Sequence, residues 1–421
     1  MNVTLLPRPL AGCVAAPPAK SQAHRALICA ALADRPMLLT NVGTGQDVAA
    51  TIACLRALGA VIDEAAGSLH ITPICNIPPH VLMNCGESGS TLRFLLPVEA
   101  ALGAECVFTA EDSLARRPIV PLAEQLTAHG IRLSPAERFP LTCAGVLQAG
   151  DFTLPGHISS QFITGLLLAL PRLPGDSTLR LTTPLVSRPY VEMTRDMLAR
   201  FGIAIEDTPN GWHIPGGQRF RAPERLQVEV DWSGAAFWLT AGALSGAGMR
   251  CEGLNSRSHQ GDRVIAGLLR RFGALVTEEA NAVTVRPGKM KALELDAADI
   301  PDLVPVLAVA AAAAKGETRI HAIGRLRLKE SDRVESILAL LRALGIRAGV
   351  EADTLCIQGG TLQGGVVDAC GDHRIAMAAA VAACAAQRPV TVLGVECTAK
   401  SYPDFFAHYA ALGGAVREAE P

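Results

Sequence analysis

The sequence predicts an α/β protein built from six similar repeats of about 70 residues. Three observations support this prediction. A helix end followed by glycine recurs at nearly constant spacing, an apolar helix opens each repeat, and a short β-rich segment follows each of these helices. A second helix and further strands complete each repeat, so that its element order is βαβαββ.

The glycine motif is the most regular of the three signals. Its glycines are Gly59, Gly130, Gly202, Gly273, Gly345 and Gly413, and they are 71, 72, 71, 72 and 68 residues apart. Glycine is favoured just after a helix, because the backbone there often takes a left-handed conformation that a Cβ atom disfavours. We therefore expect a helix to end before each glycine and a strand to begin after it.

The first helix of each repeat is apolar nearly all round. The six segments are 23–33, 90–102, 160–170, 233–244, 302–314 and 373–385. A helix without a polar face is expected in the interior of a protein. The strands that follow are expected at 37–42, 106–110, 178–183, 249–254, 318–323 and 390–395.

The order of repeats favours two domains of three repeats each. Residues 218–226 are rich in Arg and Pro and lie between the third and fourth repeats, where a hinge is expected. Two such domains would leave a cleft between them, and clefts of this kind often bind ligands.

Composition excludes several classes of protein. The net charge of −2 gives no basic field for nucleic acid. The longest apolar run, 304–314, is too short to span a membrane, and the N-terminus lacks the apolar core of a secretory signal. The twelve cysteines form no CxxC pair, which favours free thiols in a reducing cytoplasm over disulfides or a metal site.

Polar and charged residues gather at the starts of the first helices and in the loops before the second helices. Free N–H groups at a helix start attract anions, and the nearby Arg and Lys would add to that attraction. Taken singly, these residues have ordinary explanations. Ser159 and Asp302 could cap helices, and residues 329–333 could form a solvated run of ion pairs. Their joint placement instead predicts a site for a small polyanion.

The motifs KSxxxR, CGxSGST, RRPI, SSQF, VSRPY, IPDL, LKESDR, GDHR and CTAKSYPDF occur in this order along the chain. In this set the chain resembles the 5-enolpyruvylshikimate-3-phosphate synthase family. The resemblance implies an inside-out α/β barrel of two domains, the enolpyruvyl transferase fold. One domain would comprise residues 18–228 and the other 1–17 with 229–421, and the active site would lie in the cleft between them.

The resemblance also implies an activity in chorismate and aromatic amino acid biosynthesis. This family transfers the enolpyruvyl group of phosphoenolpyruvate to the 5-hydroxyl of shikimate 3-phosphate through a tetrahedral intermediate, without metal or organic cofactor. The implied catalytic residues are Asp302, which would accept the hydroxyl proton, Glu330, which would protonate the methylene carbon, and Lys20.

The resemblance assigns binding residues to both substrates. Shikimate 3-phosphate would bind to Lys20, Ser21, Arg25, Ser159, Ser160, Gln161, Ser187, Asp302 and Lys329, with Tyr190 packed near its ring. Phosphoenolpyruvate would bind to Lys20, Gly89, Arg117, Gln161, Arg333, Arg374 and Lys400. The herbicide glyphosate, which resembles phosphoenolpyruvate, would be expected near Gly89.

Three positions depart from the family pattern. Glu87 and Arg325 stand where many members have Asn, and Ala19 replaces a Ser or Gly, which leaves its backbone N–H available. The motifs assign no role to His24. Two other functions stay open at this point. One is the related UDP-N-acetylglucosamine enolpyruvyl transferase, although its reactive Cys is missing from the loop 111–120. The other is a paralogue that binds polyanions without catalysis. We expect a cytoplasmic monomer that acts on small molecules and binds neither nucleic acid nor membranes.

Overall fold

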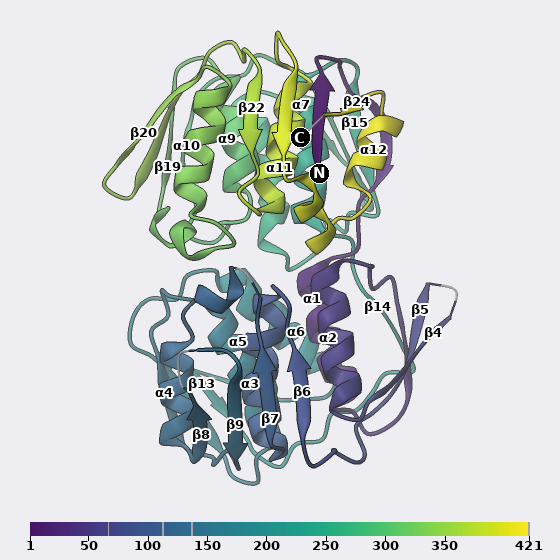
Figure 1. The fold of residues 1–421 in the computed structure, drawn as a ribbon, viewed down its shortest axis with the longest axis vertical. Helices are drawn as coiled ribbons and strands as arrows, with labels where there is room; N and C mark the ends of the chain where they lie inside the picture. The colour runs from purple at the N-terminus through teal and green to yellow at the C-terminus, as the bar shows by residue number, and fades with distance from the viewer. Residues whose placement is uncertain (66, 112, 136–137, 420–421) are drawn as a thin grey trace. The chain divides into compact units, whose positions relative to one another are not determined.

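The computed structural model describes residues 1–65, 67–111, 113–135 and 138–419 (Figure 1). The chain divides into two compact units. The contiguous unit is Lys20–Val228, and the split unit combines Met1–Ala19 with Glu229–Pro421. The segment 218–226, predicted as a hinge, runs instead into a strand of the contiguous unit, and the chain leaves this unit after Val228.

The contiguous unit contains the first three repeats. The first consists of α1 (Lys20–Ala31), β3 (Met37–Thr40), α2 (Gln46–Ala57), β4 (Val61–Ala65) and β5 (Ser68–Thr72), with β14 (Arg225–Gln227). The second consists of β6 (Val81–Asn84), α3 (Gly89–Leu102), β7 (Cys106–Thr109), α4 (Val120–Ala128), β8 (Ile131–Ser134) and β9 (Leu141–Gly145). The third consists of β10 (Asp151–Leu154), α5 (Ser160–Ala169), β11 (Ser177–Leu181), α6 (Arg188–Arg200), β12 (Glu206–Thr208) and β13 (Gly211–Ile214).

The split unit contains the other three repeats. The fourth consists of β2 (Ala11–Ala15), α7 (Trp232–Leu244), β15 (Gly248–Glu252), α8 (Ile265–Phe272), β16 (Leu275–Glu278) and β17 (Ala282–Arg286). The fifth consists of β18 (Glu294–Asp296), α9 (Val304–Ala312), β19 (Glu317–His321), α10 (Arg333–Ala343), β20 (Arg347–Glu351) and β21 (Thr354–Gln358). The sixth consists of β22 (Gly365–Asp368), α11 (His373–Ala383), β23 (Val390–Leu393), α12 (Phe405–Ala411), β24 (Ala415–Glu418) and β1 (Asn2–Leu6).

Each repeat forms one four-stranded sheet, so the described residues contain six such sheets. All six share one topology. In the second repeat, for example, the edge strand β6 is parallel to β7, β7 is antiparallel to β9, and β9 is antiparallel to β8. In the second, third, fifth and sixth repeats the first helix joins the two parallel strands, as expected for a crossover connection. In the first and fourth repeats the parallel partner, β14 or β2, comes from a distant part of the chain. The predicted βαβαββ order is confirmed.

Three strands complete sheets that belong to distant parts of the sequence. β14, at the end of the third repeat, pairs with β3 of the first repeat. β2 pairs with β15 of the fourth repeat, and β1 lies between β23 and β24 of the sixth. Each unit therefore contains a sheet that is completed by a strand from a distant part of the sequence.

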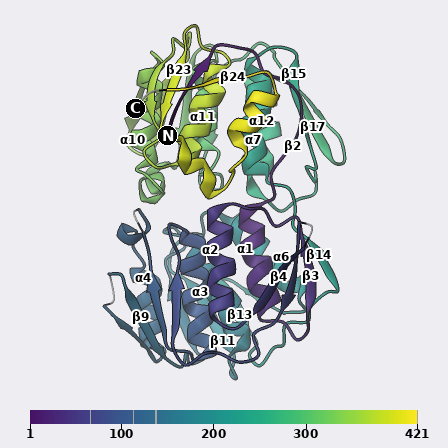
Figure 2. The same ribbon diagram turned by 45° about the vertical axis from the view of Figure 1, so that its right-hand side comes forward.

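The first helices are buried, as their apolar sequences predict. All residues of α9 and α11 are buried, as is α7 from Trp232 to Ala243. These three helices pack against one another inside the split unit. In the contiguous unit α3 packs against α1, α2 and α5, and Figure 2 shows α1, α2 and α3 side by side. The N-terminal ends of these helices carry most of the residues predicted to bind anions.

The six motif glycines all have positive φ angles, as predicted. The angles range from 73° at Gly202 to 107° at Gly273. Each glycine directly follows the last turn of a second helix, so its left-handed conformation ends that helix and turns the chain toward the next strand.

Glu99 is a carboxyl group buried in α3, and it predicts a dependence of stability on pH. Burial raises the pKa of Glu99 to about 7, although the thiols of Cys143 and Cys106 partly offset this effect. The folded state therefore favours the protonated carboxyl. Its contribution to stability is complete below the unfolded pKa and is lost as the pH rises through about 7.

We expect Glu99→Gln to increase the free energy of unfolding at pH 8 by about 1–3 kcal/mol, and to have little effect at pH 4. Urea-induced unfolding at both pH values measures this difference. Glu105→Gln, at a more exposed position of the same repeat, serves as the control and should follow the wild type at both. An equal effect of Glu99→Gln at the two pH values would contradict the prediction.

Candidate active site

The split unit gathers acidic and basic side chains at the N-terminal ends of its helices. They come from the turn before α9, from the residues that follow the 3₁₀ segment η4 (Gly324–Leu328), from the start of α11, and from η5 (Val395–Lys400). We call this group the acid–base cluster. Its members are Asp302, Lys329, Glu330, Arg333, Asp372, Arg374 and Lys400.

Arg333 is the centre of this cluster, and its side chain is only 1% exposed. Its Nη1 atom lies 2.8 Å from Asp302 Oδ1, Nη2 lies 2.6 Å from Glu330 Oε2, and Nε lies 2.7 Å from Asp372 Oδ2. Burial by itself would lower the pKa of Arg333, but the three carboxylates raise it well above its ordinary value. The alternative of a solvated ion-pair run at 329–333 is therefore wrong for Arg333, whereas Asp332 does form an exposed pair with Arg327.

Asp302 lies in the turn before α9 and is held by three cations. Arg374 Nη2 is 3.0 Å from Oδ2, while Arg333 Nη1 and Lys329 Nζ are 2.8 and 3.5 Å from Oδ1. Burial would raise the pKa of Asp302, but Arg374, Lys329 and Arg333 outweigh it and hold this pKa well below its usual value. Asp302 does not cap α9, since the residue at the cap position is Leu303.

Lys329 and Lys400 are the two lysines of the cluster. Burial lowers the pKa of Lys329 to about 8, and the positive charges of Arg333 and Arg325 act in the same direction, whereas Asp302 opposes them. Lys400 is buried and donates from Nζ to the carbonyl oxygen of Gly371 at 2.8 Å. Two of the three predicted binding lysines therefore belong to this cluster, and the third, Lys20, lies in the contiguous unit.

Asp372 was not predicted as a site residue, although it lies in the motif GDHR. It is fully buried and caps α11 by accepting from the backbone N–H of Arg374 at 2.9 Å. The same carboxylate pairs with Arg333 and accepts from Ser331 at 3.3 Å. Asp372 thus fixes two of the arginines that were predicted to bind phosphoenolpyruvate.

The contiguous unit contains the other predicted site residues. Lys20 is the first residue of α1, and its Nζ lies 2.7 Å from Asp47 Oδ2 in the first turn of α2. Both side chains are mostly buried, at 17% and 13% exposure. Sequence reasoning missed Asp47 because acidic residues are common in the first turn of any helix.

Gly89 is the first residue of α3 and lies beside two guanidinium groups. A Cβ atom added to Gly89 would lie 2.9 Å from Arg117 Nη1 and 3.1 Å from Arg93 Nη1. Arg93 also donates to Gln161 Oε1 at 2.6 Å, and Gln161 donates to Ser90 Oγ at 3.1 Å. The structure thus brings Gly89, Arg117 and Gln161 together, and it adds Arg93, which lies in the motif CGESGSTLR but was given no role.

The serines at the start of α5 are arranged as helix-terminal groups. Ser159 caps α5 by accepting from the backbone N–H of Gln161 at 3.2 Å, so the capping alternative is confirmed for this residue. Ser160 begins the helix and is 9% exposed. Their predicted contact with the phosphate of shikimate 3-phosphate stays a prediction.

Arg25 and Ser187 are both buried and conformationally fixed. Arg25 donates from Nε to Thr194 Oγ1 at 2.8 Å and from Nη2 to the carbonyl oxygen of Tyr190 at 3.0 Å. Ser187 precedes α6 with φ 55° and ψ 36°, a left-handed conformation that is strained for a residue with a Cβ atom. Such strain is common at binding sites, which agrees with the predicted role of Ser187. Ser21 lies beside Lys20 in the first turn of α1.

The positions that depart from the family pattern have local partners. Glu87 accepts from Ser113 Oγ at 3.0 Å, and Arg325 donates from Nη2 to the carbonyl oxygen of Ala298 at 2.6 Å. The N–H of Ala19, which was expected to be available to a ligand, donates instead to the carbonyl oxygen of Glu229 at 2.8 Å. That expectation was wrong because the backbone before α1 pairs with residues 229 and 230, and this pairing takes up the N–H of Ala19.

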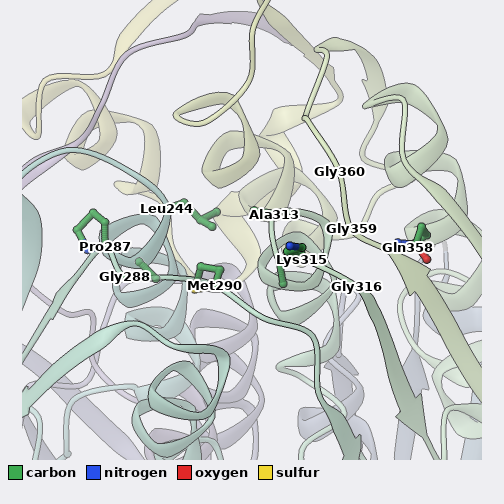
Figure 3. A pocket seen from close by; sticks show the side chains of 12 residues that line it. Leu244, Pro287, Gly288, Met290, Ala313, Lys315, Gly316, Gln358, Gly359 and Gly360 are labelled. Atoms are coloured by element: carbon green, nitrogen blue, oxygen red, sulfur yellow. The ribbon is translucent and has the colours of Figure 1, made fainter.

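The split unit also contains a pocket of about 700 Å³ at the C-terminal ends of α7 and α9 (Figure 3). Apolar residues and glycines form most of its lining, and Lys315 is its charged residue. The acid–base cluster lies at the opposite, N-terminal ends of helices of this unit. The described residues that line the pocket include no carboxyl group, so the acid and base of the reaction are not expected there.

Possible metal ligands, thiols and membrane spans can also be compared with the described residues. No group of three or more His, Cys, Asp or Glu among them is arranged to hold a metal ion. All twelve cysteines are free, as predicted. In the same part of the chain no helix has the length and apolar character needed to cross a membrane.

Comparisons with known proteins agree with this architecture. The profile of a family described as EPSP synthase (3-phosphoshikimate 1-carboxyvinyltransferase) matches residues 6–408. A 3-phosphoshikimate 1-carboxyvinyltransferase from Clostridium kluyveri is 41% identical over 99% of this chain and 98% of its own length. One from Methanocorpusculum labreanum is 37% identical over 97% and 98% of the two chains.

Solved structures show the same similarity in three dimensions. EPSP synthase from Acinetobacter baumannii superposes with a TM-score of 0.83 and 26% identity, covering 99% of this chain and all of the other. The enolpyruvyl transferase NikO from Streptomyces tendae, at 20% identity, shares the fold with a TM-score of 0.78 over 99% and 98% of the two chains. The predicted enolpyruvyl transferase fold is thereby confirmed. The protein belongs to the EPSP synthase (3-phosphoshikimate 1-carboxyvinyltransferase) family.

Proposed function

We propose that this protein transfers the enolpyruvyl group of phosphoenolpyruvate to the 5-hydroxyl of shikimate 3-phosphate. The products are 5-enolpyruvylshikimate 3-phosphate and phosphate, on the route to chorismate and the aromatic amino acids. The observation that carries this proposal is the pairing of Asp302 and Glu330 with a single arginine, Arg333. Addition to an enol double bond needs both a base and an acid, and this pairing supports two carboxyl groups in those roles.

In the addition step Asp302 accepts the proton of the 5-hydroxyl, and the oxygen attacks the enol carbon of phosphoenolpyruvate. Glu330 gives its proton to the methylene carbon, which becomes a methyl group. The tetrahedral intermediate then loses phosphate, a proton from that methyl group returns to the Glu330 carboxylate, and Lys20 assists the departure of phosphate. Arginines and lysines around the reacting atoms stabilise the charges that develop.

Asp302 is strongly acidic in the free protein, and substrate binding would allow it to act as a base. In the free protein Arg374, Lys329 and Arg333 hold its pKa well below the usual value. Each substrate brings a phosphate and a carboxylate, and we propose that these anions engage the same cations. Because the positive charge around Asp302 is then partly neutralised, its pKa rises toward the range in which a carboxylate accepts protons effectively.

We propose that the acid–base cluster and the residues around Gly89 bind one pair of substrates. Lys20 contacts both substrates. The residues proposed for shikimate 3-phosphate are Ser21, Arg25, Ser159, Ser160, Gln161, Ser187, Asp302 and Lys329. Those proposed for phosphoenolpyruvate are Gly89, Arg117, Gln161, Arg333, Arg374 and Lys400. We further propose that the protein acts as a cytoplasmic monomer, in which one chain supplies both groups.

Phosphate release by the purified protein tests this proposal. We expect release when phosphoenolpyruvate and shikimate 3-phosphate are both present, and none with either alone. Release that requires UDP-N-acetylglucosamine as the acceptor would identify the related transferase instead. Calorimetric binding of shikimate 3-phosphate without any release would identify a binding protein that has lost catalysis.

The ionisation of Lys329 is expected to set the pH above which the activity falls. Because burial lowers its pKa to about 8, Lys329 loses its positive charge as the pH rises through that value. We expect kcat/KM for shikimate 3-phosphate to fall above about pH 8, since this parameter reports ionisations of the free enzyme. In Lys329→Arg the side chain stays charged, so the fall should move to higher pH.

A pH–rate profile from about pH 6 to 10 measures this limit. Lys315→Arg makes the same substitution at an exposed position in the pocket of Figure 3, and its profile should match that of the wild type. An unmoved alkaline fall in Lys329→Arg would assign the ionisation to another group.

A further inference from the structure

A chain of buried side-chain hydrogen bonds runs through the three helices that begin near Gly89. It starts at His24 in α1, where Nδ1 lies 2.7 Å from Thr51 Oγ1 in α2. Thr51 Oγ1 lies 2.6 Å from Thr91 Oγ1 in α3, and Thr91 Oγ1 lies 2.6 Å from Ser88 Oγ. The four residues are at most 1% exposed, so water does not compete for these bonds. We call them the hydroxyl chain.

The direction in which hydrogen bonds are donated along the hydroxyl chain follows from counting the available hydrogens. A threonine hydroxyl carries a single hydrogen. Thr91 donates its hydrogen to Ser88 Oγ, so it must accept from Thr51. Thr51 then has no hydrogen left for His24, and the imidazole must donate from Nδ1–H. Burial, together with the charges of Lys20 and Arg25, keeps the pKa of His24 well below its usual value, so the ring is neutral and this arrangement persists across the working pH range.

The far end of the hydroxyl chain fixes the start of α3. Ser88 is the N-cap of α3, and its Oγ accepts from both the backbone N–H and the hydroxyl of Thr91. The next residue is Gly89, beside the guanidinium groups of Arg117 and Arg93. A helix start between two arginines favours an anion. The position of that anion site therefore depends on how Ser88 is held.

Thr91 also connects this site to the residue that holds Lys20. Its hydroxyl lies within 3.3 Å of the carbonyl oxygen of Asp47, whose carboxylate pairs with Lys20 at 2.7 Å. One threonine thus contacts both the N-cap of α3 and the first turn of α2. Displacement of Thr91 would shift the helix start and the partner of Lys20 together.

We propose that His24, Thr51 and Thr91 are positioning residues for phosphoenolpyruvate, holding Ser88 and Gly89 at the start of α3 in the geometry that receives its anionic groups. This inference rests on the proposed function and assigns a role to His24, which the sequence motifs left without one. None of the three residues needs to touch the substrate. Their effect is transmitted through Ser88, and errors in the position of a binding group of about 1 Å are enough to reduce turnover strongly.

Thr51→Val tests the proposal, because valine keeps the shape of threonine but removes the hydroxyl in the middle of the chain. We expect the KM for phosphoenolpyruvate to rise about tenfold, which corresponds to a loss of about 1.4 kcal/mol in binding. The KM for shikimate 3-phosphate should change by less than about threefold, a difference of under ~0.7 kcal/mol. Phosphate release with one substrate varied and the other saturating gives both values.

Two controls separate positioning from a general loss of structure. Thr40→Val removes another buried hydroxyl of the contiguous unit, one that makes no hydrogen bond within the described residues, and it should leave both KM values unchanged. Thr51→Ser restores the hydroxyl and should restore the KM for phosphoenolpyruvate. If Thr51→Val does not yield folded protein, Thr51→Ser and Thr51→Ala provide the same comparison.

The possible outcomes are distinct. An active wild type in which Thr51→Val and Thr40→Val have the same KM for phosphoenolpyruvate would overturn the positioning role and leave the proposed function intact. A parallel rise in the KM for both substrates, not reversed in Thr51→Ser, would show a merely structural role. Absence of phosphate release from the wild type would overturn the proposed function and this inference with it.

Discussion

Arg333→Met is expected to lower the free energy of unfolding of the split unit by about 3–5 kcal/mol, because it leaves buried carboxylates without their cation. Asp302, Glu330 and Asp372 all pair with Arg333 within 2.8 Å, and Asp372 is fully buried. Methionine fills a similar volume but supplies neither charge nor donors. Urea-induced unfolding near pH 7 measures the loss, and phosphate release should disappear in the same variant.

The matched control lies in the same segment. Arg327 also pairs with two carboxylates, Asp332 at 2.8 Å and Glu335 at 2.9 Å, but its side chain is 42% exposed. Arg327→Met is therefore expected to cost less than about 1 kcal/mol. Equal losses in the two variants would mean that burial of the carboxylates does not determine the stability of this segment.

Asp302→Asn is expected to reduce kcat by a factor of about 10²–10⁴, the contribution usually made by a general base. The amide has nearly the shape of the carboxylate, but it cannot accept the proton of the 5-hydroxyl. Its KM values should change much less than kcat, since the arginines that bind the substrate anions remain in place. Glu330→Gln should show a loss of similar size, because it removes the proposed proton donor.

The control for this prediction is Asp296→Asn in β18. Asp296 is exposed, and its Oδ1 accepts from the backbone N–H of Ala298, a contact that asparagine can keep. We expect wild-type kinetics from it. A kcat of Asp302→Asn within about threefold of the wild type would exclude Asp302 as the base, because a general base contributes at least ~10²-fold. Unfolding curves of both variants establish whether Asp302→Asn keeps its structure.

The features that the sequence predicted best are those imposed locally on the backbone. Gly59 and Gly273 end helices because a left-handed residue is needed there, and that requirement appears directly in the residue type. The first helices were recognisable as buried because their composition excludes a solvent face. α9, for example, contains no polar residue, and all of it is buried.

The pairings within the site could not be predicted in the same way. Asp47 and Asp372 each hold a predicted cation, yet the pairs join residues 27 and 39 positions apart. Asp47 looks like an ordinary first-turn residue, and Asp372 looks like an ordinary cap. Only the packing of one helix start against another gives them a partner, and that packing depends on tertiary structure rather than on local sequence. The same holds for Ala19, whose N–H is used by Glu229.

The pairing of β1 affects when the split unit can fold during synthesis of the chain. Residues 2–6 pair with residues 390–393 and 415–418, which are synthesised long after them. At about 5–20 residues per second, the first strand waits for roughly 20–80 seconds before its partners exist. The contiguous unit contains all the strands of its sheets, so it can acquire its structure during translation. The sheet that contains β1 cannot be completed until residues 415–418 have been synthesised.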